Sequence, residues 1–170
     1  MKKQRFVQMI MAILLVETGC AHLLREGKIR SEGKNKFEKI FLQAQMLSKV
    51  TEGGMSYEAF QDNLSILEEE IFKYKGKVEE EKEKELVGCY EEVYALYKDI
   101  GKLWGYMIHS AIDSDGKRWK EIANILSRRN IHPVAPQVLP RAFNKLLGEV
   151  REKLIEAETS YYNCKEEDKN

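Results

Sequence analysis

The sequence predicts an all-α protein, an antiparallel up-and-down helical bundle of about four main helices plus a short accessory helix. Apolar residues recur at alternating steps of three and four along most of the chain after residue 36, and this is the spacing of one face of an α-helix. All three prolines lie between Pro133 and Pro140, so helix-breaking residues are confined to one connection. The other connections are short, which favours antiparallel neighbours.

The composition fits one ordered domain. Lys and Arg number 28, Asp and Glu also number 28, and 43% of the 170 residues are apolar. This balance argues against a uniformly basic nucleic-acid coat and against a polyacidic disordered chain. No internal repeat marks a second domain. We expect the bundle domain to comprise residues 35–164, followed by a disordered tail at 165–170.

The first two helices are predicted between residue 37 and residue 78. An apolar stripe from Phe37 to Val50 predicts a helix that ends at Gly53-Gly54. Ser56 is a suitable N-cap for the next helix, and Met55 and Phe60 are placed as a hydrophobic staple. The apolar seam of this second helix continues through Tyr74 to Val78, and Gly76 with the charge run 79–85 indicates a break or an exposed turn there.

The third helix has the longest periodic stripe, from Leu86 to Ala111. A turn at residues 113–116, the accessory helix at 117–129 and a proline-containing connection at 132–140 follow. The last helix begins near Pro140 and keeps its apolar face to Tyr161. Tyr90, Tyr97 and Trp104 stand seven residues apart, a spacing that indicates core packing more than the lining of a ligand pocket.

The N-terminus has the three parts of a secretory signal. Lys2, Lys3 and Arg5 precede the apolar run 6–16, and polar and small residues follow up to Cys20. Eleven helical residues span about 16 Å, roughly half of a bilayer core, so a membrane-spanning helix would be strained. We therefore expect a removed signal peptide at residues 1–19.

The end of this segment resembles the lipobox of bacterial lipoproteins, in which a cysteine directly follows small residues. Thr18 and Gly19 match the two positions before Cys20, whereas Glu17 stands where the family usually has Leu. The resemblance implies that Cys20 is acylated and that residues 20–34 form a tether to the bundle. Three alternatives remain open: ordinary cleavage near Ala21, an uncleaved anchor, and an amphipathic first helix of a cytosolic protein.

The other two cysteines, Cys89 and Cys164, form a possible disulfide. If Cys20 is acylated, an even pair remains, as exported proteins favour. Cys89 lies 23 residues before Ile112, near the end of the third helix, and Cys164 lies 23 residues after Arg141, near the start of the last helix. If these two helices are antiparallel neighbours, both cysteines lie near the same end of the bundle. The alternative is two unpaired thiols. The histidines lack metal-ligand spacing and no C-x-x-C occurs, so we predict no metal site and no cofactor.

Charge is distributed unevenly along the chain. Thirteen acidic and five basic residues lie between Glu52 and Glu92, whereas eight basic and two acidic residues lie between Lys117 and Arg151. Such a field attracts an acidic partner, an anionic headgroup or nucleic acid to the C-terminal half. The residues of this possible basic docking patch are Lys117, Arg118, Lys120, Arg128, Arg129, Arg141 and Lys145.

Part of this basic region resembles the helix-turn-helix arm of large serine recombinases. The matching residues run from Arg118-Trp119 through Ile122-Ala123 to Pro133, but the Gly-rich wing and the catalytic region of that family are missing. Nucleic acid is therefore an unfavoured partner. The sequence favours a lipid-anchored protein of the bacterial cell envelope, facing the periplasm or exterior, with a non-catalytic structural or partner-binding role. The alternatives are a cytosolic DNA-binding protein that uses residues 117–147 and a small-ligand-binding bundle.

Overall fold

The computed structural model describes residues 36–109, 116–133 and 135–167, and the side chains of these residues up to 164. The predicted signal peptide, Cys20, the tether and residues 168–170 lie outside the described residues. The described ranges are helical and contain no strand, which confirms the all-α prediction. Their elements are α2 (Glu38–Gly53), α3 (Tyr57–Phe72), α4 (Glu81–His109), α5 (Lys117–Arg128), the 3₁₀ turn η2 (Pro136–Val138) and α6 (Leu139–Glu167).

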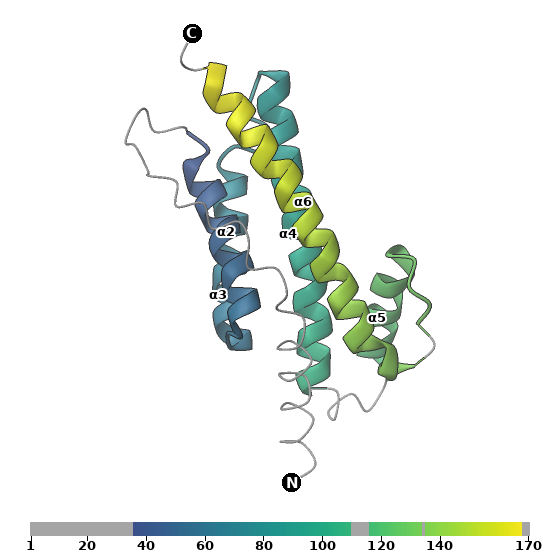
Figure 1. Ribbon diagram of the computed structural model, residues 1–170. Helices are drawn as coiled ribbons and strands as arrows, with labels where there is room; N and C mark the ends of the chain where they lie inside the picture. Colours follow the sequence, from purple (N-terminus) through teal and green to yellow (C-terminus); the bar gives the residue numbers. More distant parts are fainter. Residues whose placement is uncertain (1–35, 110–115, 134, 168–170) are drawn as a thin grey trace. The chain divides into compact units, whose positions relative to one another are not determined.

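Four of these helices form the bundle within one compact unit that starts at Phe37 (Figure 1). The two long helices α4 and α6 lie side by side, and the shorter hairpin of α2 and α3 packs against them. The short helix α5 lies in the connection between α4 and α6 and packs beside α4. This arrangement matches the predicted four main helices and one accessory helix.

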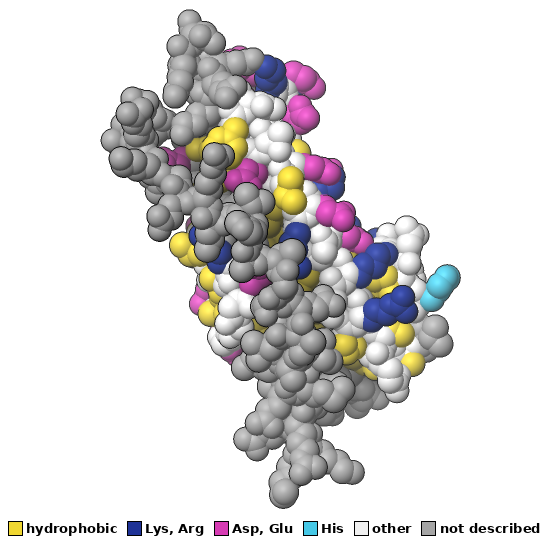
Figure 2. Space-filling model, viewed as in Figure 1, with side chains coloured by type: hydrophobic (Ala, Val, Ile, Leu, Met, Phe, Trp, Pro, Cys, Tyr) yellow, Lys and Arg dark blue, Asp and Glu magenta, His cyan; other side chains and the backbone are white. Residues whose placement is uncertain are grey.

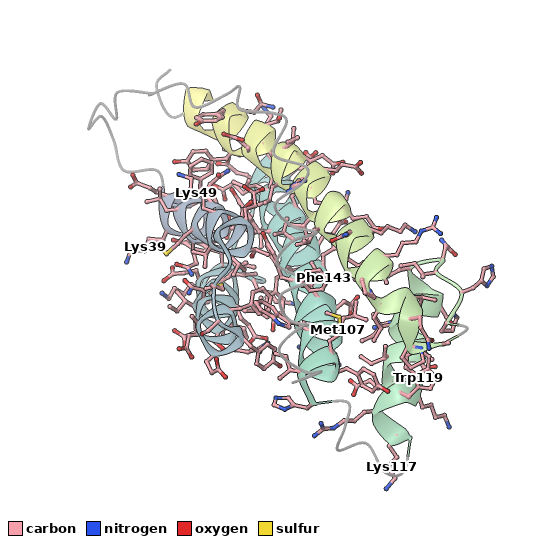
Figure 3. The ribbon with its side chains drawn as sticks, turned by 60° about the horizontal axis from the view of Figure 1, so that its bottom comes forward. Lys39, Lys49, Met107, Lys117, Trp119 and Phe143 are labelled. Atoms are coloured by element: carbon pink, nitrogen blue, oxygen red, sulfur yellow. The ribbon has the colours of Figure 1, made fainter. Side chains whose placement is uncertain are left out.

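Ring contacts define how the helices are aligned. Trp104 of α4 meets Phe143 of α6 edge to face, with 6.1 Å between ring centroids. Phe41 of α2 stacks on Tyr161 of α6 at 4.4 Å. Early residues of one helix thus face late residues of its neighbour, as antiparallel packing requires. Figure 3 shows Phe143 directed from α6 toward α4.

The core is continuous through the bundle and uses the residues that the periodicity indicates. Residues of all five helices contribute to one buried cluster. Its largest fully buried side chains are Tyr90, Tyr97, Phe37, Phe60, Ile40, Leu47, Leu67, Leu86, Ile100, Leu103, Ile125 and Leu126. Burial of such side chains contributes about 1.5–3 kcal/mol each before the entropy cost of ordering them.

Helix ends follow the local sequence signals in most places. The Ser56 hydroxyl accepts a hydrogen bond from the backbone N–H of Ala59 at 3.2 Å, so the predicted N-cap is confirmed. α3 ends at Phe72, a few residues before the break indicated at Gly76, and the seam residues Tyr74 and Val78 pack against the core from the segment that follows the helix. The turn is closed by Gly76 at φ 71°, a conformation that glycine adopts without strain.

The last helix is longer than expected. The sequence places the end of the bundle domain at residue 164, whereas α6 continues to Glu167. The charged residues after Cys164 lack an apolar stripe, but they are good helix formers and extend an existing helix at low cost.

Candidate functional site

Neither the anchor residue nor its surroundings belong to the described part of the chain. Cys20, the predicted lipidation site, lies outside it. None of the described helices combines the length and the apolarity that a membrane crossing requires. The chemistry that the structure does place is concentrated where α4, α5 and the start of α6 meet.

Cys89 and Cys164 are thiols in the structure, so the possible disulfide is not formed. Burial raises the pKa of the Cys89 thiol, and a hydrogen bond with Ser160 lowers it by less. The thiol of Cys164 lies 3.8 Å from the carbonyl oxygen of Lys82, on an earlier turn of α4. Both cysteines do lie near the same end of the helix pair, as the sequence indicates.

The register of α4 against α6 explains why no bond forms. Cys164 is level with residues 82–83 of α4, six or seven positions before Cys89. At 1.5 Å per residue, this offset separates the two side chains by about 9 Å along the bundle. A disulfide needs about 3.5–4.5 Å between Cβ atoms. The prediction identified the correct end of the bundle and missed the register.

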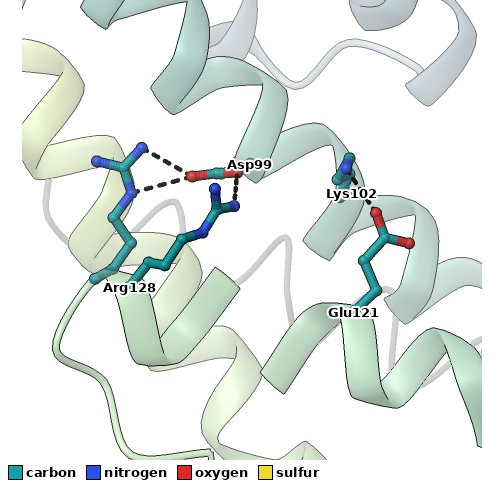
Figure 4. A network of polar contacts seen from close by, with 5 residues as sticks. Asp99, Lys102, Glu121 and Arg128 are labelled. Carbon is teal, nitrogen blue, oxygen red and sulfur yellow. Dashed lines mark hydrogen bonds and ion pairs between the residues drawn. The ribbon is translucent and has the colours of Figure 1, made fainter. Parts of the chain in front are cut away.

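A buried aspartate holds α5 against the bundle. Asp99 of α4 has a side chain that is only 10% exposed, and it faces two arginines at the end of α5. Arg129 donates to Oδ2 from Nε at 3.0 Å and from Nη2 at 2.8 Å, and Arg128 donates to Oδ1 from Nη2 at 3.3 Å (Figure 4). We call Asp99, Arg128 and Arg129 the Asp99 clamp.

Two further contacts fix α5 on either side of this clamp. Lys145 of α6 donates from Nζ to the carbonyl oxygen of Arg129 at 2.9 Å, and this places a cation at the C-terminal end of α5 where helix carbonyls lack partners. Lys102 of α4 donates to Glu121 of α5 at 2.6 Å (Figure 4). The accessory helix is therefore held by polar contacts from both long helices.

The structure divides the predicted basic patch into two groups. Arg128, Arg129 and Lys145 make the internal contacts just described, so part of the expected docking charge has a structural role. Six members of the patch are exposed, and only Arg129 is partly buried. The exposed members that make none of the contacts just described are Lys117, Arg118, Lys120 and Arg141. They lie on α5 and the first turn of α6, and Figure 2 shows Lys and Arg side chains gathered toward that part of the visible face.

A small open cleft lies where α3, α4 and α5 converge. It has a volume of about 210 Å³, and its walls include Tyr57, His109 and Arg118 together with the Lys102–Glu121 pair. Gly105 also lines the cleft. It leaves room for Tyr57, because a Cβ at position 105 would lie 2.7 Å from the Tyr57 hydroxyl. A second hollow of about 360 Å³ lies between α4 and α6 beside Arg129. Charged side chains of both signs line each of them.

The aromatic residues spaced seven apart pack in the core, as their spacing indicates. Tyr90 and Tyr97 are each 1% exposed, and Trp104 contacts rings from α3 and α6. Burial raises the pKa of Tyr97 to about 12, with hydrogen bonds from Ser48 and Thr51 acting in the opposite direction. No group of three or more potential metal ligands occurs among the described residues.

Sequence reasoning missed Asp99. The sequence carries no distinguishing signal for it, since Glu85 and Glu92 of the same helix also directly precede core residues and are exposed. The pair Arg128-Arg129 follows about thirty residues later. The sequence alone gives no reason to match these charges, because the match depends on where α5 folds back.

We compared the chain with known proteins. No protein-family model, curated protein sequence or solved structure matches this chain.

Proposed function

We propose that this chain is an exported protein of the bacterial cell envelope, anchored by a lipid on Cys20, whose helical bundle has a non-catalytic, partner-binding role. One observation carries the proposal. A basic start, an apolar run at 6–16 and the sequence Thr18-Gly19-Cys20 precede the bundle.

The proposed anchor precedes the described bundle, whose core cluster runs from Phe37 to Tyr161. Sixteen residues separate Cys20 from Phe37, and a chain of that length reaches at most about 50–55 Å. A lipid on Cys20 would hold the bundle at the membrane surface and leave its faces accessible.

The partner that the bundle fits best is acidic. Lys117, Arg118, Lys120 and Arg141 are exposed on α5 and the start of α6. The Asp99 clamp and the contact from Lys145 to Arg129 hold these two helices in a fixed relation. A rigid basic surface binds an acidic partner with less ordering cost than a flexible one.

The three cysteines give the lipid anchor a test with matched controls. The full chain is produced in a bacterium with a fatty-acid analogue, and the membrane fraction is analysed by labelling and intact mass. We expect the wild-type, Cys89→Ala and Cys164→Ala chains to carry the label on a product that begins at Cys20. Cys20→Ala should lose both the label and membrane association. A Cys20→Ala chain that still carried the label would reject the lipid on Cys20.

A DNA-binding role is the second candidate, and the order of α5, a turn and α6 with exposed Arg141 supports it. Binding through phosphate contacts weakens steeply with salt. If the candidate is correct, Arg141→Glu and Lys120→Glu should weaken binding to duplex DNA at low salt, whereas Lys49→Glu on α2 should weaken it less. Equal effects of all three variants would show nonspecific attraction and would reject it.

A further inference from the structure

One face of the bundle exposes apolar side chains between charges of opposite sign. Lys39, Leu42, Met46 and Lys49 recur at steps of three and four on α2, and Glu58, Asp62, Ile66 and Glu69 recur similarly on α3. All eight side chains are exposed. We call this set the α2–α3 face. Figure 3 shows Lys39 and Lys49 on the α2 side of the molecule.

The apolar part of the face is central. Leu42 and Met46 are each 51% exposed, and Ile66 is 45% exposed. Met46 is one turn from Gln43, and Ile66 is one turn from Asn63. Gln43 donates to the carbonyl and side-chain oxygens of Asn63 at 3.1 and 3.3 Å, which fixes the two helices against each other here. The exposed apolar residues therefore lie along the groove between α2 and α3.

The charges of the face are separated by helix. Its lysines belong to α2 and its carboxylates belong to α3. Among the ion pairs of the described residues, none involves Lys39, Lys49, Glu58, Asp62 or Glu69. The face thus carries a positive edge, an apolar centre and a negative edge, and Lys73 at the end of α3 lies one turn from Glu69 and interacts with it electrostatically.

Such a face is complementary to a second copy of itself. A twofold axis parallel to the helices would bring α2 of one copy opposite α3 of the other, in antiparallel orientation. The Gln43–Asn63 contact defines which residues of α2 and α3 lie at the same height along the helix axes. Lys39 lies at the height of Leu67, and Lys49 lies at the height of Tyr57. In the pair, Lys39 would lie beside Glu69 of the other copy and Lys49 beside its Glu58. Leu42 would lie near the other Ile66.

We propose that the α2–α3 face joins two copies of this chain in an isologous dimer. Each charge pair would occur twice because the same patch serves both copies. The face extends over helices of sixteen residues, about 24 Å, and small interfaces of this kind give weak association. The proposal does not rest on the lipid anchor, although an anchor would favour pairing by concentrating copies on one surface.

Sedimentation equilibrium of the full chain tests the dimer. The protein is measured in a density-matched non-ionic detergent, from about 1 µM to 1 mM, as wild type and as Cys20→Ala. We expect both to associate to dimers with similar constants, so loss of lipid anchoring and loss of dimerisation are distinguishable. A monomer throughout this range would overturn the proposal.

Charge exchange tests the predicted pairing. Lys39→Glu and Glu69→Lys should each weaken the dimer by about tenfold, since each creates two like-charge contacts. The double variant should restore association to within about threefold of wild type. Failure of the double variant to recover would reject the arrangement.

Apolar variants test the centre of the face. Met46→Glu and Ile66→Lys should abolish the dimer in this concentration range. Ile155→Glu is the control, because Ile155 is 64% exposed but lies on α6. Circular dichroism and melting of each variant establish that the monomer is folded. Equal weakening by Ile155→Glu would overturn the assignment to α2 and α3.

Discussion

Arg129 gives two hydrogen bonds to one carboxylate oxygen of Asp99, from Nε at 3.0 Å and from Nη2 at 2.8 Å. Asp99 lies within α4, the helix with the longest stripe of core residues, and Arg129 lies at the C-terminal end of the accessory helix α5. The side chain of Arg129 is 28% exposed, whereas that of Arg128 is 68% exposed. Arg129 is therefore the main partner of the buried acid.

Asp99→Ala is expected to destabilise the protein by about 2–3 kcal/mol, because it leaves a half-buried guanidinium without its acceptor. Arg129→Ala should cost a similar amount, since it leaves the buried carboxylate without its best donors. Arg128→Ala should cost about 0.5 kcal/mol or less, as for other exposed ion pairs. Chemical denaturation followed by circular dichroism measures all three. A cost for Arg128→Ala equal to that of Arg129→Ala would contradict the ranking.

The thiols at Cys89 and Cys164 can be counted by alkylation. We expect both to react after unfolding without reductant, and Cys89 to react more slowly in the folded protein than in the unfolded one. Burial covers its sulfur and raises its pKa, and only the thiolate is reactive. Mass spectrometry of the alkylated chain gives the count. If unfolded protein took up label at neither residue until reductant was added, the two cysteines would be joined after all.

The sequence predicted the helices well because their apolar stripes are long and uninterrupted. The core residues from Leu86 to Ile100 and from Leu146 to Tyr161 follow the expected spacing. The errors have local causes. The second helix ends at Phe72 although its apolar seam continues beyond it, and the cysteine pairing required a register that spacing does not fix.

The candidate site was predicted only as a set of charges. The sequence identified seven basic residues, but it did not show that Arg129 and Lys145 are used to hold α5 in place. Roles of this kind depend on tertiary contacts between residues far apart in sequence. The buried acid Asp99 engages Arg128 and Arg129, and these partners are known only once α5 is folded back.

Tyr97 should make the protein less stable at high pH. Its pKa rises to about 12 in the folded state because burial disfavours the phenolate. The unfolded side chain titrates near 10, so the associated stability is complete below about pH 10 and is lost as pH rises toward 12. The loss from this residue is on the order of 2 kcal/mol.

Denaturation curves at a series of alkaline pH values test this contribution. Tyr97→Phe should be less stable than wild type at neutral pH, because the contacts with Ser48 and Thr51 are lost. It should also show a smaller decline between pH 10 and 12. An unchanged decline would assign the alkaline sensitivity to other residues.

Glu17→Leu is expected to increase lipoprotein processing. In the resemblance to lipoproteins, Glu17 occupies a position where the family usually has Leu, and transfer of a carboxylate into an apolar subsite is costly. Pulse–chase labelling of the full chain measures the fraction processed with time. Glu17→Asp keeps the charge and should process no faster than wild type. If Leu and Asp had the same effect, the charge at this position would not limit processing.

Gly105 tests how closely α3 approaches α4 at the cleft. A Cβ at this position would lie 2.7 Å from the Tyr57 hydroxyl and 3.2 Å from the ring carbon that bears it, so Gly105→Ala forces the ring to move. A Cβ at Gly148 of α6 has no atom within 4 Å. Gly148→Ala should therefore stabilise the protein by about 0.5–1 kcal/mol through helix propensity. Gly105→Ala should lose that gain and be less stable than Gly148→Ala by about 1–2 kcal/mol.

Removal of the hydroxyl isolates this contact. In a Tyr57→Phe background the nearest clashing atom is absent, so Gly105→Ala should be tolerated better there than in wild type. Denaturant midpoints of the two single variants and the double variant give the coupling between the positions. Strict additivity would show that Gly105 is not needed for the approach of Tyr57, and the cleft wall would then be set by other contacts.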